Sequence, residues 1–254
     1  MGVILEARDV SKAFGGLRAV NGASVAFAAR QITSIIGPNG AGKTTLFNLL
    51  TGFVAPDAGR IVFEDTDITG WPPYRVAIKG LARSFQDLRV LTQMTVLENL
   101  CLARPNQAGE QLLANFFSGR RVRKQEAAER ERALEALEFI RLREKADEPA
   151  HRLSYGQQKL LVIARLVAMD AEVMMLDEPT AGLDPSMIER VSDAIRRLVE
   201  LGKTVVLVEH NLDVVRALSE EVVFMNEGRV LEVGPPARVL SDRDLINVYL
   251  GLSA

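Results

Sequence analysis

The chain has 254 residues, of which 48% are hydrophobic and 25% charged, and its formal net charge is −2. This length and composition predict a globular protein with one large domain, or one domain that carries an inserted lobe. The slight negative charge gives the chain as a whole no electrostatic attraction to nucleic acid. The single cysteine, Cys101, excludes an internal disulfide and is expected to be a small buried hydrophobic residue.

The amino-terminal stretch predicts antiparallel strands rather than a targeting segment. Residues 3–14 (VILEARDVSKAF) and 19–27 (AVNGASVAF) alternate between apolar and polar side chains, as strands with one solvated face do. Charged residues among the first fourteen positions leave no apolar region for a signal peptide. No uninterrupted apolar run approaches the roughly 20 residues of a membrane-spanning helix, so we expect any membrane role to depend on a partner.

A phosphate-binding loop is predicted at residues 37–45. The apolar run 31–36 (QITSII) indicates a buried strand, and the stretch after the loop predicts a helix that ends at Gly52. Between them, GPNGAGKTT matches the pattern G-x-x-x-x-G-K-[ST], whose glycines let backbone N–H groups surround phosphate oxygens at a helix N-terminus. Lys43 is expected to reach the β- and γ-phosphates, and the Thr44 hydroxyl is expected to bind Mg²⁺.

The character of the sequence changes between residues 92 and 150. After a predicted strand at 60–63, strand signals give way to helical ones, most clearly over 121–145, which is rich in Glu, Arg, Ala and Leu. We interpret this region as a helical lobe inserted into an α/β core. The basic run RRVRK at 120–124 is interpreted as a solvated helix start, because acidic residues follow it directly. His151, near the end of the lobe, is expected to be structural or solvent-exposed.

Strands and helices alternate after the lobe. Residues 173–176 and 204–208 are apolar runs that predict buried strands. Residues 156–169 and 186–201 predict helices, the second with Asp184 as its N-cap. This alternation predicts a parallel sheet that is covered on both faces.

Polar side chains that suit phosphate hydrolysis follow the predicted strands. Asp177 and Glu178 end one apolar strand, where an aspartate can hold Mg²⁺ and a glutamate can act as general base toward water. His210 ends the next strand and can donate a hydrogen bond to a γ-phosphate. Gln86 follows a short strand, and its amide oxygen can ligate Mg²⁺ and the attacking water. We therefore predict Glu178, His210 and Gln86 as catalytic residues, and Thr44, Gln86 and Asp177 as Mg²⁺ ligands.

A second phosphate-binding element is indicated at residues 153–158 (LSYGQQ), where a serine and a glycine precede a predicted helix. The motifs together resemble the ATP-binding-cassette (ABC) ATPases. The Walker A loop GPNGAGKTT, the Q-loop FQD, the signature LSYGQQ, the Walker B strand VMMLDEP, the D-loop AGLD and the switch histidine His210 come in the family's order. The resemblance covers essentially the whole chain. It departs at Tyr155, where the usual signature has glycine, and we expect this ring to point away from the nucleotide.

The resemblance implies a fold and a mode of nucleotide binding. The fold would be α/β, with a P-loop NTPase core of the ABC ATPase type, an N-terminal antiparallel β-subdomain and an inserted helical lobe. One ABC ATPase domain would span 1–254, with the core at 1–90 and 155–254 and the signature lobe at 91–154. In the family two cassettes pair head to tail, and each signature closes over ATP held by the other P-loop. The implied ATP-binding residues are Phe14, which would stack on adenine, Gly37, Pro38, Asn39, Gly40, Ala41, Gly42, Lys43, Thr44, Thr45, Ser154, Gly156 and Gln157.

A finer resemblance is to the ATPase subunits of branched-chain amino-acid uptake systems. It is carried by FGGLRAVN, LTGF, ARSFQDLRVLTQMTVLENL, the tyrosine-containing signature and the terminal VYLG. It implies an ATP-hydrolysing importer subunit at the cytoplasmic face of the inner membrane. The implied partners are a second ABC ATPase subunit, either a paralogue or a second copy, two transmembrane permeases and, indirectly, a periplasmic binding protein. No nucleic acid is implied as a partner.

Several alternatives stay open at the level of the sequence. Close relatives of this subfamily import amides or urea, and a lipopolysaccharide-export ATPase has similar motifs. Some ABC ATPases are soluble and act in DNA repair or on the ribosome, although those typically carry two cassettes or a long coiled coil. A small-molecule P-loop kinase would lack the signature and the switch histidine. The cargo and the choice between a homodimer and a heterodimer are left open.

Overall fold

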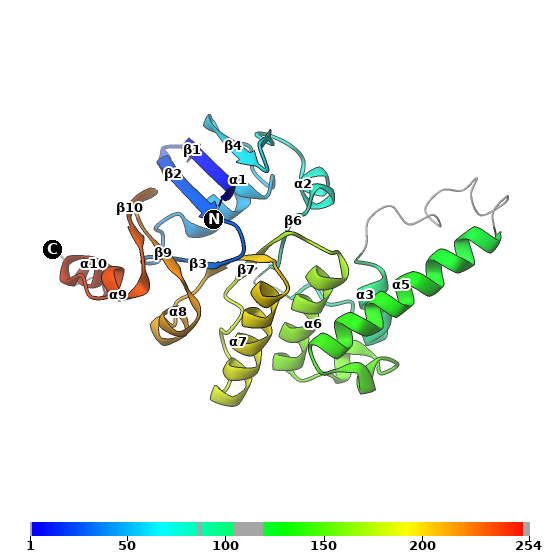
Figure 1. The fold of residues 1–254 in the computed structure, drawn as a ribbon. Coiled ribbons are helices and arrows are strands. Elements are labelled where there is room, and N and C mark those ends of the chain that lie inside the picture. The colour runs from blue at the N-terminus through cyan, green and yellow to red at the C-terminus, as the bar shows by residue number, and fades with distance from the viewer. Residues whose placement is uncertain (1, 86–87, 104–118, 251–254) are drawn as a thin grey trace. The chain divides into compact units, whose positions relative to one another are not determined.

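The computed structural model describes residues 2–85, 88–103 and 119–250 (Figure 1). The chain divides into two compact units. Unit 1 comprises Met1–Gln86 and Glu172–Ala254, and unit 2 comprises Asp87–Ala171. The sequence LSYGQQ and the helix that follows it therefore belong to unit 2, whereas the predicted phosphate-binding loop belongs to unit 1.

Unit 1 contains an antiparallel sheet with the strand order β2-β1-β4-β5. Its strands are β1 (Val3–Phe14), β2 (Leu17–Ala28), β4 (Ala58–Phe63) and β5 (Thr66–Asp67). The predicted antiparallel pairing of the amino-terminal strands is confirmed, with Glu6 opposite Ala26 and Phe14 opposite Leu17. One face of this sheet is apolar and fully buried, as Leu5 and Phe27 show.

The second sheet of unit 1 has the order β10-β9-β3-β8-β7-β6. Its strands are β3 (Ile32–Ile36), β6 (Leu81–Arg83), β7 (Val173–Asp177), β8 (Thr204–Val208), β9 (Glu221–Asn226) and β10 (Arg229–Gly234). All neighbours pair in parallel except β9 and β10, so the predicted parallel sheet is confirmed. The loops that leave β3, β7 and β8 therefore emerge at the same edge, which is where ligands bind in open α/β sheets.

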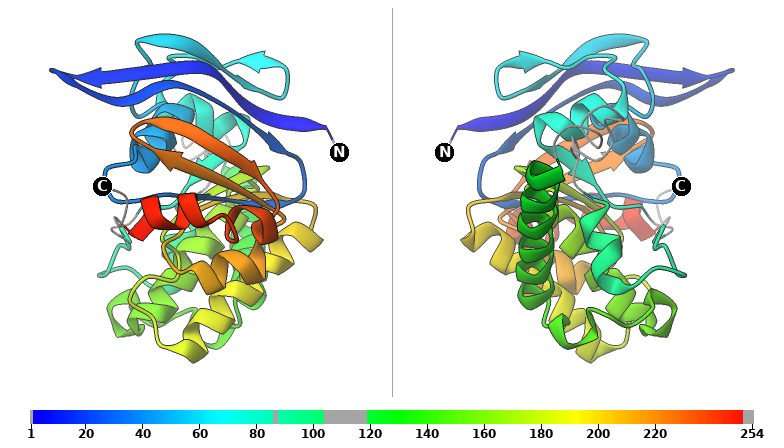
Figure 2. Two further views of the ribbon diagram at one scale, coloured as in Figure 1. Left: turned by 90° about the vertical axis from the view of Figure 1, so that its left-hand side faces the viewer. Right: turned by 90° about the vertical axis from the view of Figure 1, so that its right-hand side faces the viewer.

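Helix α1 (Lys43–Leu50) lies between the two sheets of unit 1 (Figure 2). Its buried residues Leu46, Phe47 and Leu50 share one core with side chains from both sheets. The remaining helices of unit 1 are α2 (Pro73–Lys79), α7 (Pro185–Glu200), α8 (Leu212–Leu218), α9 (Pro236–Val239) and α10 (Arg243–Leu250). Asp184 caps α7 as predicted. A second core joins α8, α9 and α10 to the β3 and β9 strands.

Unit 2 is helical, as predicted, with α3 (Val96–Cys101), α5 (Gly119–Phe139), α6 (Tyr155–Ala168) and the short 3-10 helices η2 (Arg143–Lys145) and η3 (Ala150–Arg152). The helical pattern predicted over 121–145 is wrong at its end, because α5 stops at Phe139. Arg141 adopts a left-handed backbone with φ 57°, and the Leu142 N–H donates to the Leu137 carbonyl, which closes the helix and turns Leu142 into the core.

The structure also shows the surroundings of Cys101 and His151. Cys101 is only half-buried, less than predicted, although burial raises the pKa of its thiol. His151 is exposed and its Nδ1 lies 3.1 Å from the Thr92 carbonyl oxygen, which confirms a structural or solvent-exposed role. Among the residues that the structure describes, we find no helix with the length and apolar character that a bilayer crossing requires.

Candidate active site

The loop between β3 and α1 surrounds the ammonium group of Lys43. This residue opens α1 and is only 6% exposed, and its Nζ donates to the Gly37 and Pro38 carbonyl oxygens at 2.7 and 2.9 Å. Burial lowers the pKa of Lys43, although the nearby charges of Glu178 and Asp177 oppose this shift. Gly42 precedes the helix without a capping side chain, so the first-turn N–H groups are available to an anion.

Glycine is required at Gly37 by both conformation and space. Its φ is 151°, and a Cβ built there would lie 2.0 Å from the Met225 carbonyl oxygen of β9. Gly40 in the same loop also has a positive φ of 81°, but a Cβ there would meet nothing within 4 Å. The loop therefore packs tightly against β9 at Gly37 and is open at Gly40.

Gly37→Ala and Gly40→Ala form a matched pair that separates these two requirements. We expect Gly40→Ala to lower the free energy of unfolding by about 1–2 kcal/mol, the usual cost of a left-handed backbone. Gly37→Ala should cost a further 1–3 kcal/mol or so, because its methyl group overlaps main chain that has no room to move. Urea unfolding of both variants measures the difference, and equal destabilisation would contradict the close approach to Met225.

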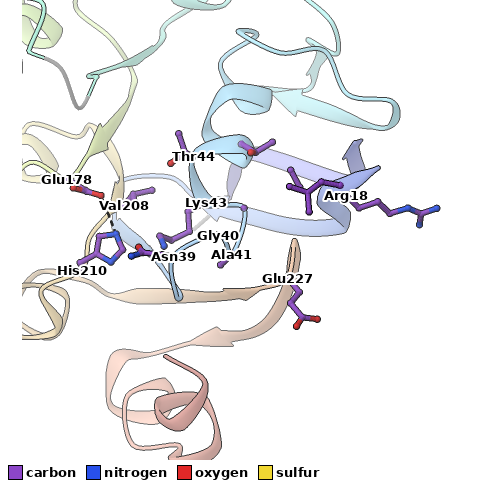
Figure 3. Close-up of a pocket in the computed structure, with 14 residues that line it drawn as sticks. Arg18, Asn39, Gly40, Ala41, Lys43, Thr44, Glu178, Val208, His210 and Glu227 are labelled. Carbon is purple, nitrogen blue, oxygen red and sulfur yellow. Dashed lines mark ion pairs between the residues drawn. The ribbon is translucent and has the colours of Figure 1, made fainter. Parts of the chain in front are cut away.

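Glu178 and His210 face each other at the ends of β7 and β8 (Figure 3). Glu178 Oε1 lies 3.2 Å from His210 Nε2, and the two form an ion pair when the imidazole is protonated. Glu178 has a positive φ of 48°, and its N–H donates to the Val208 carbonyl at 2.9 Å. A residue with this backbone is strained by about 1–3 kcal/mol, and such strain is concentrated at functional sites.

Asp177, the last residue of β7, is held by an arginine that sequence reasoning did not single out. Arg83 at the end of β6 donates to Asp177 Oδ2 at 2.9 Å and to Asn48 Oδ1 at 2.5 Å. Both side chains of the ion pair are almost fully buried, 4% and 5% exposed. The Asp177 N–H donates to Ser84 Oγ at 3.0 Å. The carboxylate is therefore fixed in orientation beside the phosphate-binding loop.

A pocket of about 440 Å³ in unit 1 collects most of the predicted residues (Figure 3). It is lined by Leu17, Arg18, Ala19, Asn39, Gly40, Ala41, Gly42, Lys43, Thr44, Thr45, Glu178, Val208, His210 and Glu227. Leu17 to Ala19 open β2, and Glu227 lies in the turn between β9 and β10. These four residues were not predicted to belong to the site. Phe14 is not among the lining residues. It is 49% exposed and pairs with Leu17 across the first hairpin.

The signature residues lie in unit 2 and form a capping box at the start of α6. Ser154 Oγ accepts the Gln157 N–H at 3.3 Å, and the Gln157 side-chain oxygen accepts the Ser154 N–H at 3.0 Å. Gly156 is buried. Tyr155 is 49% exposed, with Lys159 Nζ 5.6 Å from its ring centroid. The Gln157 side chain is thus used by its own helix in this geometry.

The oxygen donors of the site suit a hard cation. The predicted Mg²⁺ ligand Gln86 lies outside the described residues. The other two predicted ligands are the Thr44 hydroxyl and the Asp177 carboxylate. Within the described residues, no group of three or more His, Cys, Asp or Glu side chains could hold a metal by itself. Mg²⁺ in nucleotide sites is bound through one or two carboxylates together with substrate phosphates, so this sparse donor set fits.

The comparisons with known proteins agree with this geometry. The family model described as ABC transporter matches residues 20–181. This chain belongs to the ABC transporter family. The ATPase is 40% identical over 249 residues to the high-affinity branched-chain amino acid transport ATP-binding protein BraF of Pseudomonas aeruginosa, with 98% of each chain covered. It is 37% identical to the corresponding protein LivG of Escherichia coli, again over 98% of both chains.

Solved ABC structures share the fold over nearly the whole ATPase. A nucleotide-free ATP-binding cassette from an ABC transporter matches with a TM-score of 0.86 and 35% identity, covering 98% of this chain and 99% of that one. The ADP conformation of an ATP-binding cassette matches equally well, with a TM-score of 0.86 and 34% identity over 99% of this chain and 100% of that one. The predicted fold class is therefore confirmed, and the chain is an ATP-binding ABC ATPase.

Proposed function

We propose that this ATPase powers the uptake of branched-chain amino acids through membrane permeases. The observation that carries the proposal is the similarity to BraF and LivG over almost the whole length of each chain. The resemblance that the sequence showed in FGGLRAVN, LTGF and the terminal VYLG points to the same subfamily.

The proposed hydrolysis uses residues at the carboxyl edge of the six-stranded sheet. Backbone N–H groups of Asn39 to Thr45 would hold the phosphates, and Lys43 would neutralise the β- and γ-phosphates. Glu178 would act as the general base, accepting a proton from the water that attacks the γ-phosphate in line. His210, 3.2 Å from Glu178, would orient that carboxylate and donate a hydrogen bond to the γ-phosphate.

We propose Thr44, Asp177 and Gln86 as the residues that hold Mg²⁺. When bound there, Mg²⁺ would supply positive charge that offsets the negative charge developing on the phosphates during transfer. Arg83 would keep the Asp177 carboxylate in one orientation through the buried ion pair. Ser154 and Gly156 are proposed to close over ATP held by a second cassette, because they lie at the N-terminus of α6 in unit 2.

The proposed assembly contains this ATPase, a second ABC ATPase subunit, two transmembrane permeases and an associated periplasmic binding protein. We place it at the cytoplasmic face of the inner membrane, attached through the permeases. The second ATPase is proposed to be a paralogue, with a second copy of this chain as the alternative.

Uptake of radiolabelled leucine, isoleucine and valine tests the proposal directly. A strain that lacks this chain should lose high-affinity uptake of these amino acids, and the wild-type chain should restore it. The Glu178→Gln variant should be expressed at the same level as the wild-type chain but should fail to restore uptake. A tagged chain purified from gently solubilised membranes should bring two permeases and a second ATPase with it.

Other results would assign another function. Unchanged uptake of branched-chain amino acids, with loss of amide or urea uptake, would keep the transporter and replace the cargo. A chain that purifies with ribosomes or DNA and without permeases would contradict transport.

A further inference from the structure

A buried carboxylate connects the two loops that carry Glu178 and His210. Glu209 follows the last residue of β8, directly before His210, and is only 2% exposed. Its Oε1 accepts from the Thr180 N–H at 3.0 Å and from the Thr180 hydroxyl at 2.7 Å. Its Oε2 accepts from the His210 N–H at 3.2 Å. One side chain thus holds both loops at once.

Of the two loops that Glu209 holds, the one after β7 contains the strained residue Glu178. Thr180 lies two residues after Glu178, whose φ is 48° and whose N–H donates to the Val208 carbonyl. A strained backbone persists only where the surrounding contacts fix it. The carboxylate of Glu209 supplies such contacts on the carboxyl-terminal side of Glu178, and the Val208 carbonyl supplies one at Glu178 itself.

The other polar group of the His210 main chain is held from the C-terminal helix. The Tyr249 hydroxyl donates to the His210 carbonyl oxygen at 2.9 Å. Leu245, Val248 and Tyr249 pack α10 against the core that α8, α9 and β9 form. Burial, with a contribution from the negative charge of Glu209, raises the pKa of Tyr249, so its hydroxyl stays a donor at neutral pH.

We propose that Glu209 and Tyr249 are positioning residues for ATP hydrolysis, which fix the N–H and the carbonyl of His210 and so keep its imidazole opposite Glu178. Within the described residues neither side chain lines the pocket, so both act through His210 rather than on the nucleotide. The inference rests on the roles proposed above for Glu178 and His210. It also makes α10, at the far end of the sequence, part of the catalytic apparatus.

Glu209→Gln and Tyr249→Phe test the inference in the full-length chain. A glutamine has one acceptor oxygen and one NH₂ group, so it can accept from Thr180 or from His210 but not from both. We expect kcat for ATP to fall by about 10–100-fold in Glu209→Gln, as small displacements of a catalytic group do. Tyr249→Phe removes one hydrogen bond and should lower kcat by about 2–10-fold. The KM for ATP and the Kd measured with the nucleotide should stay within about twofold of wild type.

Matched controls distinguish positioning from general loss of stability. Glu220 Oε2 accepts the Ile32 N–H at 2.6 Å at the opposite end of the same sheet, so Glu220→Gln makes the same chemical change away from the site. Tyr74 is 68% exposed on α2 and serves as the control for the loss of a hydroxyl. Both controls should turn over ATP like the wild type.

The imidazole signals provide a second readout, because the chain has two histidines. In NMR spectra of Glu209→Gln and Tyr249→Phe, the His210 ring signals should shift and those of His151, which contacts Thr92, should not. Unchanged kcat and unchanged His210 signals in both variants would overturn the inference. A fall in kcat that is matched by a loss of ATP affinity or of folded protein would also overturn it. The His210→Ala variant in the same assay distinguishes failure of this inference from failure of the proposed function. If His210→Ala turned over ATP normally, His210 itself would have no role in hydrolysis.

Discussion

Replacing Glu178 with glutamine is expected to lower steady-state ATP turnover by about 10²–10⁴-fold, the usual contribution of a positioned general base. Glutamine has nearly the same shape as glutamate, but its amide does not accept a proton at neutral pH. The pocket and the phosphate-binding loop keep every group that holds the nucleotide, so ATP should bind as tightly as before. Phosphate release measures the turnover, and equilibrium binding measures the affinity for ATP, both on the same preparation.

Glu189→Gln is the control for the Glu178 variant. Glu189 is exposed on α7, which begins after the same strand and loop, and its replacement removes the same charge without touching the pocket. Its turnover should equal that of the wild type. If Glu178→Gln also turned over ATP at the wild-type rate, the general base would have to be another residue.

Lys43→Met is expected to weaken ATP binding by about 10–100-fold, because charge-assisted hydrogen bonds to the phosphates are lost. The ligand-free chain should keep its melting temperature. Burial lowers the pKa of Lys43, so a neutral side chain of similar length relieves a desolvation cost, and this gain offsets the loss of the two hydrogen bonds to the Gly37 and Pro38 carbonyl oxygens. Thermal unfolding with and without Mg-ATP should therefore show an unchanged midpoint in the absence of ligand and a reduced shift in its presence.

The control for this variant is Lys79→Met. Lys79 lies on α2 and pairs with Glu64 at 3.0 Å, outside the pocket. The ATP-dependent shift in melting temperature should be preserved there. A full shift in Lys43→Met would show that the buried ammonium does not contact the phosphates.

The parts of the site that the sequence predicted are those with local causes. The loop at 37–45 is defined by its own glycines and lysine. Glu178 and His210 each lie two positions after a run that is apolar enough to be a buried strand. Parallel strands then bring these ends to one edge whatever lies between them in the chain. The long lobe between residues 92 and 150 did not obscure the strands on either side of it in the sequence, because its helical periodicity is distinct from that of the strands.

The residues that sequence reasoning missed act through contacts between distant segments. Arg83 looks like an ordinary strand residue until β6 pairs with β7 and brings its guanidinium to Asp177. Glu209 and Tyr249 are separated by a helix–strand–strand–helix segment and meet only at the main chain of His210. The end of α5 was missed for a related reason, since a left-handed Arg141 is favoured by the core that Leu142 enters rather than by local propensity.

The connection between β6 and β7 also has a consequence for folding kinetics. These strands are neighbours in the sheet, but all of unit 2 lies between them in the chain, and the hydrogen bond from Asp177 to Ser84 joins residues 93 positions apart. The entropy lost in closing such a loop grows with the number of flexible residues in it. Any part of unit 2 that is already ordered shortens the flexible loop and makes the pairing of β6 less costly. The buried ion pair of Arg83 and Asp177 is therefore a contact of high contact order, the kind that limits folding rates in two-state domains.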